Sequence, residues 1–261
     1  MSSENGEHGE NTAAGHGSTP RYVLPLVVRI EKDAPPSRTD ALETAARAVL
    51  TLLSDPRAGG TGDAEGEWAR AVREWDDSQI RKVVRRARGA EWRRAGTLPG
   101  ITVRGGGAPG GGGAGAPDTA GGGPSGAAEV RVFPPVPLDG WPKELRKLQV
   151  SGTELDDPVE PPPADPAHPV LWLSPHLALS AGKAMAQVGH GAQLAWWELP
   201  ERARAAWRAA GFPLSVRTAE PAHWRRLLAA GVPVVRDAGY TEIAPSDTVA
   251  VEGYERVRSL V

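Results

Sequence analysis

The chain has 261 residues, which is enough for one large domain or two small ones. It contains no cysteine, which excludes disulfides, iron–sulfur clusters, thiolate zinc sites and cysteine nucleophiles. The net charge of −2 does not by itself indicate a nucleic-acid binder. No apolar run approaches the roughly 20 residues that a membrane helix needs.

A polar N-terminal tail and two low-complexity segments divide the chain into regions. Residues 1–20 are polar and lack the apolar core of a signal peptide, so we expect a disordered tail and a cytoplasmic protein. The Gly-rich segment 105–127 predicts a flexible insertion, and the acidic, proline-rich segment 156–168 predicts a semi-rigid linker. These boundaries define an N-terminal region, 21–155, and a C-terminal domain, 169–261.

The N-terminal region alternates strand and helix patterns. Asp40 followed by Glu43 resembles a capping box, which predicts a helix over 41–53. The other expected elements are a strand at 23–30, a helix at 78–95, strands at 101–103 and 129–133, and a helix at 141–148.

The C-terminal domain has clearer signals. Ser180 is a suitable N-cap for a helix that reaches about residue 199, and Pro221 suits the first position of a helix over 222–230. The other expected elements are a helix at 201–210 and strands at 170–173, 214–218, 232–235 and 247–252. This order predicts an α/β fold with helices covering a mixed sheet. The N-terminal region echoes the order, which indicates either a diverged second copy that lacks the motif lysine or an unrelated α/β extension.

Lys183 occupies the first turn of a predicted helix, directly after a strand. A cation there opposes the helix dipole, and together with free backbone N–H groups it makes an anion site. A solvated surface lysine explains the residue equally well. The P-loop is rejected because Leu177 and Ala184 stand where that motif needs glycine and Ser or Thr. The histidines lack zinc-ligand spacing, so we expect neither a metal nor a cofactor.

Helical spacing places Lys183, Gln187 and His190 on one face. Taken alone, His190 is more often a structural histidine than a functional one. Gly189 and Gly191 each weaken a helix by roughly 1 kcal/mol relative to alanine. They therefore indicate close approach of another backbone or a substrate, or else tight packing of the helix on the sheet.

A second cluster covers residues 236–248. Asp237 falls just past the carboxyl end of one predicted strand, and Lys183 follows the carboxyl end of another. Ligands bind at that edge of open α/β sheets. Thr241 and Thr248 add two hydroxyl groups. The spacing predicts that a lysine, a carboxylate and these hydroxyls converge.

Together these residues resemble two signature motifs of the type II (archaeal and eukaryotic-type) peptidyl-tRNA hydrolase family, and the motifs occur in the family's order. The first is Gly182-Lys183-x-x-Ala186-Gln187-x-x-His190, and the second is Arg236-Asp237-Ala238-Gly239-x-Thr241-x-Ile243-Ala244-Pro245. The resemblance covers residues 169–253, about a third of the chain. It departs from the family at Tyr240, where a basic residue is usual, at Gly191, where alanine is usual, and in the stretch 245–248, which is one residue short.

The resemblance implies an α/β/α three-layer domain on a mixed four-stranded sheet that hydrolyses the ester of peptidyl-tRNA without a cofactor. It implies that Lys183, Asp237, Thr241 and Thr248 are catalytic and that Gln187 and His190 lie nearby. We expect Gln187, His190, Arg236 and Arg217 to bind substrate. Two other interpretations remain open. One is a catalytically weak RNA-binding or interaction module on the same fold, and the other is a hydrolase that acts on a different ester.

With no cysteine and no nucleophile elbow, direct attack of water is the expected chemistry. Asp237 would orient or deprotonate the water, and Lys183 would stabilise the oxyanion or a terminal phosphate. Thr241 would supply a positioning hydroxyl. The degenerate N-terminal repeat would replace a dimer partner, giving a monomer with an internal pseudo-dimer. The C-terminal part offers cations for tRNA (Lys183, Arg217, Arg225, Arg226, Arg236), and so does the helix expected at 78–95 (Arg81, Lys82, Arg85, Arg86, Arg88, Arg93, Arg94). A solvated amphipathic helix explains the second group equally well.

Overall fold

The computed structural model describes residues 21–59, 64–106, 126–237 and 245–260. The N-terminal half forms a mixed five-stranded sheet in which β1 is parallel to β2 and antiparallel to β4. Four strands have the order β2-β1-β4-β3, and β5 pairs with β1. The elements are β1 (Tyr22–Arg29), α1 (Arg38–Leu53), α2 (Pro56–Gly59), α3 (Ala69–Asp76), β2 (Lys82–Ala87), α4 (Gly89–Gly96), β3 (Ile101–Arg104), β4 (Glu129–Val132), β5 (Val136–Pro137) and α5 (Lys143–Arg146).

The C-terminal half forms a mixed four-stranded sheet in the order β7-β6-β9-β8. Here β6 is parallel to β7 and antiparallel to β9, so the strand order and directions repeat those of the first sheet. The elements are β6 (Val170–Leu173), α6 (Ala181–Glu198), α7 (Glu201–Ala209), β7 (Ser215–Thr218), α8 (Pro221–Ala229), β8 (Val234–Asp237), β9 (Ser246–Glu252) and the 3-10 helix η1 (Tyr254–Leu260). The predicted α/β class and the mixed sheet are confirmed.

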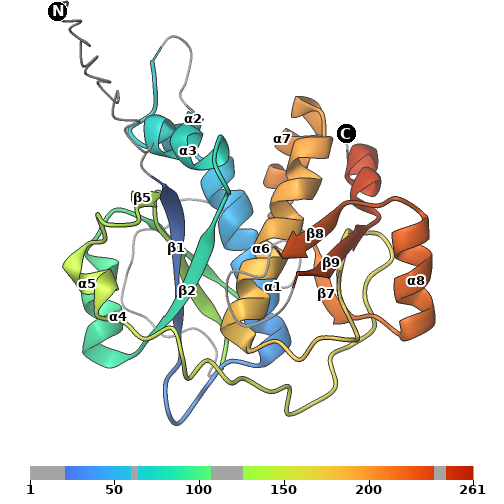
Figure 1. Ribbon diagram of the computed structural model, residues 1–261, viewed down its shortest axis with the longest axis horizontal. Coiled ribbons are helices and arrows are strands. Elements are labelled where there is room, and N and C mark those ends of the chain that lie inside the picture. Colours follow the sequence, from blue (N-terminus) through green and yellow to red (C-terminus); the bar gives the residue numbers. More distant parts are fainter. Residues whose placement is uncertain (1–20, 60–63, 107–125, 238–244, 261) are drawn as a thin grey trace, which may run out of the picture.

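The two halves stack into five layers, seen from left to right in Figure 1. The long helices α1 and α6 pack against each other between the two sheets. Helices α4 and α5 cover the outer face of the first sheet, and α8 covers the outer face of the second. This arrangement places α6 between β2 of one half and β8 of the other.

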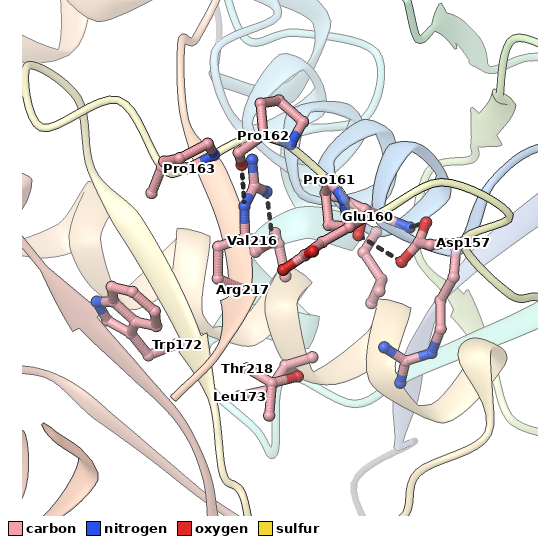
Figure 2. Close-up of a pocket in the computed structure, with 14 residues that line it drawn as sticks. Asp157, Glu160, Pro161, Pro162, Pro163, Trp172, Leu173, Val216, Arg217 and Thr218 are labelled. Carbon is pink, nitrogen blue, oxygen red and sulfur yellow. Dashed lines mark hydrogen bonds between the residues drawn. The ribbon is translucent and has the colours of Figure 1, made fainter. Parts of the chain in front are cut away.

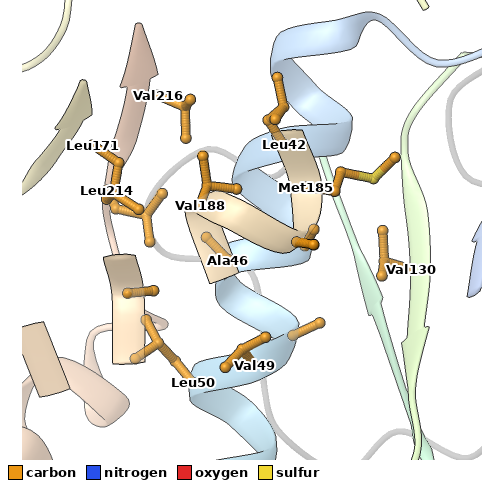
Figure 3. Packing of buried hydrophobic residues seen from close by; sticks show 14 of the residues in the cluster. Leu42, Ala46, Val49, Leu50, Val130, Leu171, Met185, Val188, Leu214 and Val216 are labelled. Carbon is orange, nitrogen blue, oxygen red and sulfur yellow. The ribbon is translucent and has the colours of Figure 1, made fainter. Parts of the chain in front are cut away.

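A shared hydrophobic core joins the halves. Figure 3 shows Ala46 and Leu50 of α1 beside Val188 of α6 and Leu214, which precedes β7. All four residues belong to one buried cluster that reaches both sheets. The hydrophobic effect that stabilises each half therefore acts across their boundary.

The helix predicted over 78–95 is wrong. Residues 82–87 form β2, which pairs in parallel with β1 and aligns Val84 with Leu26. Gly89, with a φ of 47°, begins the short helix α4. The β-branched pair Val83 and Val84 suits a strand, and pairing with the available edge of β1 outweighs the helical propensity of the arginines, because tertiary context overrides propensity.

The predicted strands and most helices are confirmed, with shifts of a few residues at their ends. Ser180 caps α6 through a hydrogen bond from the Lys183 amide, and Pro221 begins α8. The cap of α1 is Ser37 and not Asp40, because the Ser37 side chain accepts from the Asp40 amide. The helix expected at 141–148 is reduced to one turn, α5.

The proline-rich segment 156–168 lies against α1 and β7. The Asp157 carboxylate accepts bonds from the amide and hydroxyl of Thr39, and the Pro162 carbonyl accepts from Arg217. None of the helices in the described ranges is both long enough and apolar enough to cross a membrane.

Candidate active site

The site lies at one edge of the second sheet, where β8 ends and α6 begins. Because β9 runs antiparallel to both β6 and β8, β6 and β8 point the same way and their carboxyl ends lie at the same edge of the sheet. Lys183 stands in the first turn of α6, just after β6, and Asp237 is the last residue of β8. The topology therefore brings together two residues that lie 54 positions apart.

Lys183 and Asp237 form a close ion pair. The Lys183 Nζ lies 2.5 Å from Oδ2 of Asp237, and Gln187 Nε2 donates to the same oxygen over 2.7 Å. The two charged side chains are only 13% and 9% exposed, so solvent screens their attraction less than at an open surface. The pair keeps a carboxylate and an ammonium at one partly water-accessible point.

Thr248 supports this pair through Gln187. Its hydroxyl donates to Gln187 Oε1 over 2.8 Å, which orients the amide so that Nε2 faces Asp237. Thr248 is fully buried, and its contact with the Val235 carbonyl ties it to β8. Thr248 thus acts on the site through Gln187.

His190 lies one helical turn further along the same face of α6. Its Nδ1 is 3.1 Å from Nζ of Lys82, a residue of β2 in the N-terminal half. Burial, together with the charges of Lys82 and Lys183, lowers the pKa of His190 well below its usual value. The imidazole is therefore held neutral around neutral pH.

No family model matches the chain, and neither does any curated protein or solved structure. The chemistry of the site is therefore deduced from its own residues.

The N-terminal half carries the opposite charge at the equivalent position. Ser37 caps α1 as Ser180 caps α6, so Asp40 occupies the place of Lys183. The Asp40 carboxylate accepts hydrogen bonds from the amides of Gly106 and Ala128, which flank β3 and β4. In the N-terminal half, a structural anion thus replaces the lysine, and there is no lysine–aspartate pair at this point.

The other residues expected at the site lie apart from this pair or outside the described residues. Thr241 and Tyr240 belong to the second group. The Arg236 side chain is 83% exposed beside Asp247. Arg217 is on β7, at the far end of the strand order from β8, where it contacts Glu43 and the Pro162 carbonyl.

A separate cavity of about 800 Å³ opens beside Arg217, between the start of α1, β7 and the proline-rich segment (Figure 2). Its polar walls are largely occupied by internal contacts, such as those of Thr39 with Asp157. Within the described ranges, no cluster of three or more histidine and acidic side chains is arranged to hold a metal ion.

The two helix glycines are explained by packing. A Cβ on Gly191 would lie 3.0 Å from Val249 and 3.3 Å from Leu171, both in the sheet. A Cβ on Gly189 would lie 3.0 Å from Val49 of α1. Tight packing of α6 on its neighbours therefore accounts for both positions.

The expected basic helix does not exist, and its cations are spread over β2 and α4. Lys82 is buried, while Arg85 and Arg86 bond to carbonyls of residues 146–151. Arg88, Arg93 and Arg94 are exposed on or beside α4.

The sequence reasoning missed Lys82 as a site residue. A helix over 78–95 would have made it one solvated cation among many, whereas the alternation of β2 turns it inward. The signal that pointed to this was the adjacent Val83-Val84 pair, which is typical of a strand.

Proposed function

We propose that the chain is a peptidyl-tRNA hydrolase that cleaves the ester between a peptide and the terminal ribose of tRNA. The observation that carries the proposal is the ion pair of Lys183 with Asp237, braced by Gln187. The two motifs that resemble the type II family meet at this pair, and the strand order explains why.

Water is the nucleophile in this proposal. Asp237 accepts a hydrogen bond from the water and takes its proton as the water oxygen bonds to the ester carbonyl carbon. The Lys183 ammonium stabilises the negative charge that develops on the carbonyl oxygen. When the bond to the ribose oxygen breaks, the proton passes from Asp237 to that oxygen, which releases tRNA and a free peptide acid.

The ion pair prepares both groups for these roles. The ammonium lies 2.5 Å from Oδ2 of Asp237, which keeps the two groups together before substrate arrives. Gln187 fixes the second contact of Oδ2, so the carboxylate is held in one orientation before substrate arrives. This arrangement also explains a lysine placed against the helix dipole.

Exposed arginines suit the phosphates of tRNA. Arg236 adjoins Asp237 in the chain, and its side chain is 83% exposed. Arg88, Arg93 and Arg94 add a second exposed group on the N-terminal half. Each cation that contacts a phosphate releases counterions, so binding should weaken as salt rises.

The test compares Lys183→Ala and Asp237→Asn with the wild type for release of free tRNA from purified peptidyl-tRNA at saturating concentration. We expect each substitution to lower kcat by about 100-fold or more, because it removes a proton acceptor or an oxyanion donor. Lys147→Ala and Asp165→Asn are matched controls, since both residues are exposed and lie outside the site.

Near-full turnover by both site variants would refute the assignment. If the wild type binds tRNA in a salt-dependent manner but releases none, the chain is instead the RNA-binding module considered above.

A further inference from the structure

A lysine from the N-terminal half reaches the functional face of α6. The Nζ of Lys82 lies 2.5 Å from Gln193 Oε1 and 3.1 Å from His190 Nδ1, and both partners belong to α6. Its third contact is the Ile80 carbonyl, at 3.4 Å. Lys82 is 6% exposed, and its ammonium lies 4.8 Å from the centre of the Trp75 ring.

Hydrogen-bond direction in this network is set by its outer members. Gln193 Nε2 donates to the Asp76 carboxylate over 2.8 Å, so Gln193 presents its oxygen to Lys82. The Ile80 carbonyl can only accept. An ammonium has three N–H donors, and with two of them directed to these oxygens the third remains for His190 Nδ1.

We propose that Lys82 is a positioning residue for the C-terminal site, holding His190 as a neutral imidazole with its proton on Nε2. When Nδ1 accepts from Lys82, the ring proton must lie on Nε2. Nε2 has no partner among the residues that the structure describes, so its N–H can donate to a bound substrate.

The position of His190 on α6 places this N–H donor next to the candidate site. Lys183, Gln187 and His190 follow one another along one face of α6, one turn apart, so His190 extends the site beyond the ion pair. A phosphate or ribose oxygen next to the ester is the group that such a donor would bind. This use rests on the proposed function, whereas the protonation state of His190 does not.

The charges around His190 favour the neutral ring. Lys82 and Lys183 both lower its pKa, in addition to burial. Burial lowers the pKa of Lys82 well below its usual value, and Asp76, the acidic group of the network beyond Gln193, opposes that effect. The N-terminal half thus contributes both the lysine and its counter-charge.

The first experiment needs no functional assay. Two-dimensional ¹H–¹⁵N NMR of imidazole nitrogens in the full chain reports the tautomer of each histidine, and His190→Gln assigns the signal of His190. We expect the Nε2–H tautomer in the wild type between pH 6 and 8. A wild-type ring that carries its proton on Nδ1, or is protonated at pH 7, would overturn the proposal even if no variant folds.

The second experiment replaces the donor. Lys82→Met keeps the apolar stem and removes the ammonium, so we expect mixed tautomers and a rise of at least one unit in the pKa of His190. Lys147→Met, the same change at an exposed site, should leave both unchanged. If Lys82→Met retains the wild-type tautomer and titration, Lys82 does not position His190.

A third measurement separates positioning from mere stability. If the chain hydrolyses peptidyl-tRNA, the acid limb of kcat/KM should move to higher pH in Lys82→Met, following His190. A lower rate with an unmoved acid limb would refute the catalytic use of His190. A wild type without hydrolase activity would refute the proposed function and leave the NMR result to decide the role of Lys82.

Discussion

At the scale of single residues, one position separates the two halves chemically. The third residue after the helix cap is Asp40 in α1 and Lys183 in α6. Asp40 agrees with the helix dipole and binds two backbone amides, which stabilises a loop. Lys183 opposes the dipole, and its ion pair with Asp237 stabilises a charge that the dipole disfavours.

Thr248→Val tests the support behind the ion pair. The change removes the hydroxyl that donates to Gln187 Oε1 and leaves that buried oxygen unsatisfied. We expect a loss of about 1–3 kcal/mol in the free energy of unfolding, measured by urea denaturation. Thr218→Val, on an exposed residue of β7, is the control and should be nearly neutral. Equal stabilities of the two variants would argue against a supporting role for Thr248.

His190 predicts a pH dependence of stability. Its folded pKa lies well below the unfolded value of about 6.5. As the pH falls below that value, the unfolded chain binds a proton that the folded chain does not, so stability falls. We expect the wild type to lose about 1–2 kcal/mol more than His190→Gln between pH 7.5 and 5.0.

Urea denaturation at the two pH values measures this difference. His176→Gln, on an exposed histidine, is the control and should keep the wild-type dependence. A pH slope that is the same in wild type and His190→Gln would contradict the prediction.

At the scale of elements, α6 has two tightly packed faces. It lies on its own sheet near Gly191 and on α1 near Gly189, and small residues permit both approaches. The same helix contacts β2 and β8. Close packing on these sides holds the face with Lys183 and His190 at a fixed position between the two halves.

Gly191→Ala tests this packing. Alanine favours a helix by up to about 1 kcal/mol, but its Cβ would lie within 3.3 Å of three buried side chains. We therefore expect a net loss of about 1–2 kcal/mol in stability. Gly96→Ala is the matched control, because a Cβ on this helical glycine meets nothing within 4 Å. That variant should be neutral or slightly more stable, and a stabilised Gly191→Ala would show that α6 can move away from the sheet.

At the scale of the whole molecule, two topologically equivalent halves share one core. Helix α1 of the first half lies against α6 of the second, and the lysine of β2 reaches α6 from the side. The N-terminal half thus covers a helix face that would otherwise expose apolar side chains to water. It also contributes a polar contact to the candidate site.

A shared core predicts that the halves unfold together. Leu50→Ala in α1 removes a fully buried side chain and should cost about 2–5 kcal/mol. We expect hydrogen exchange, followed by mass spectrometry, to accelerate by the same factor in β1 and β6. Leu228→Ala, at a residue that is 37% exposed on α8, should change little. Faster exchange in β1 alone would show that the halves unfold independently.

The local sequence was sufficient for most elements but not for β2. Ser180, Pro221 and the apolar runs of the C-terminal half predict elements that the structure confirms, because caps and periodicity act over a few residues. The segment around Lys82 has both helical and strand signals. The free edge of β1 decided between them, and nothing near Lys82 in the chain reveals that edge.

The sequence by itself determined the α/β class, the helix that carries Lys183 and a strand that ends close to Asp237. These follow from side-chain size, polarity and spacing, which are local properties. Only the tertiary structure decided that Lys183 and Asp237 form an ion pair, that Thr248 acts through Gln187, and that Lys82 meets His190. Those contacts join residues 50 to 108 positions apart, and they depend on strand order and on the packing of α1 against α6.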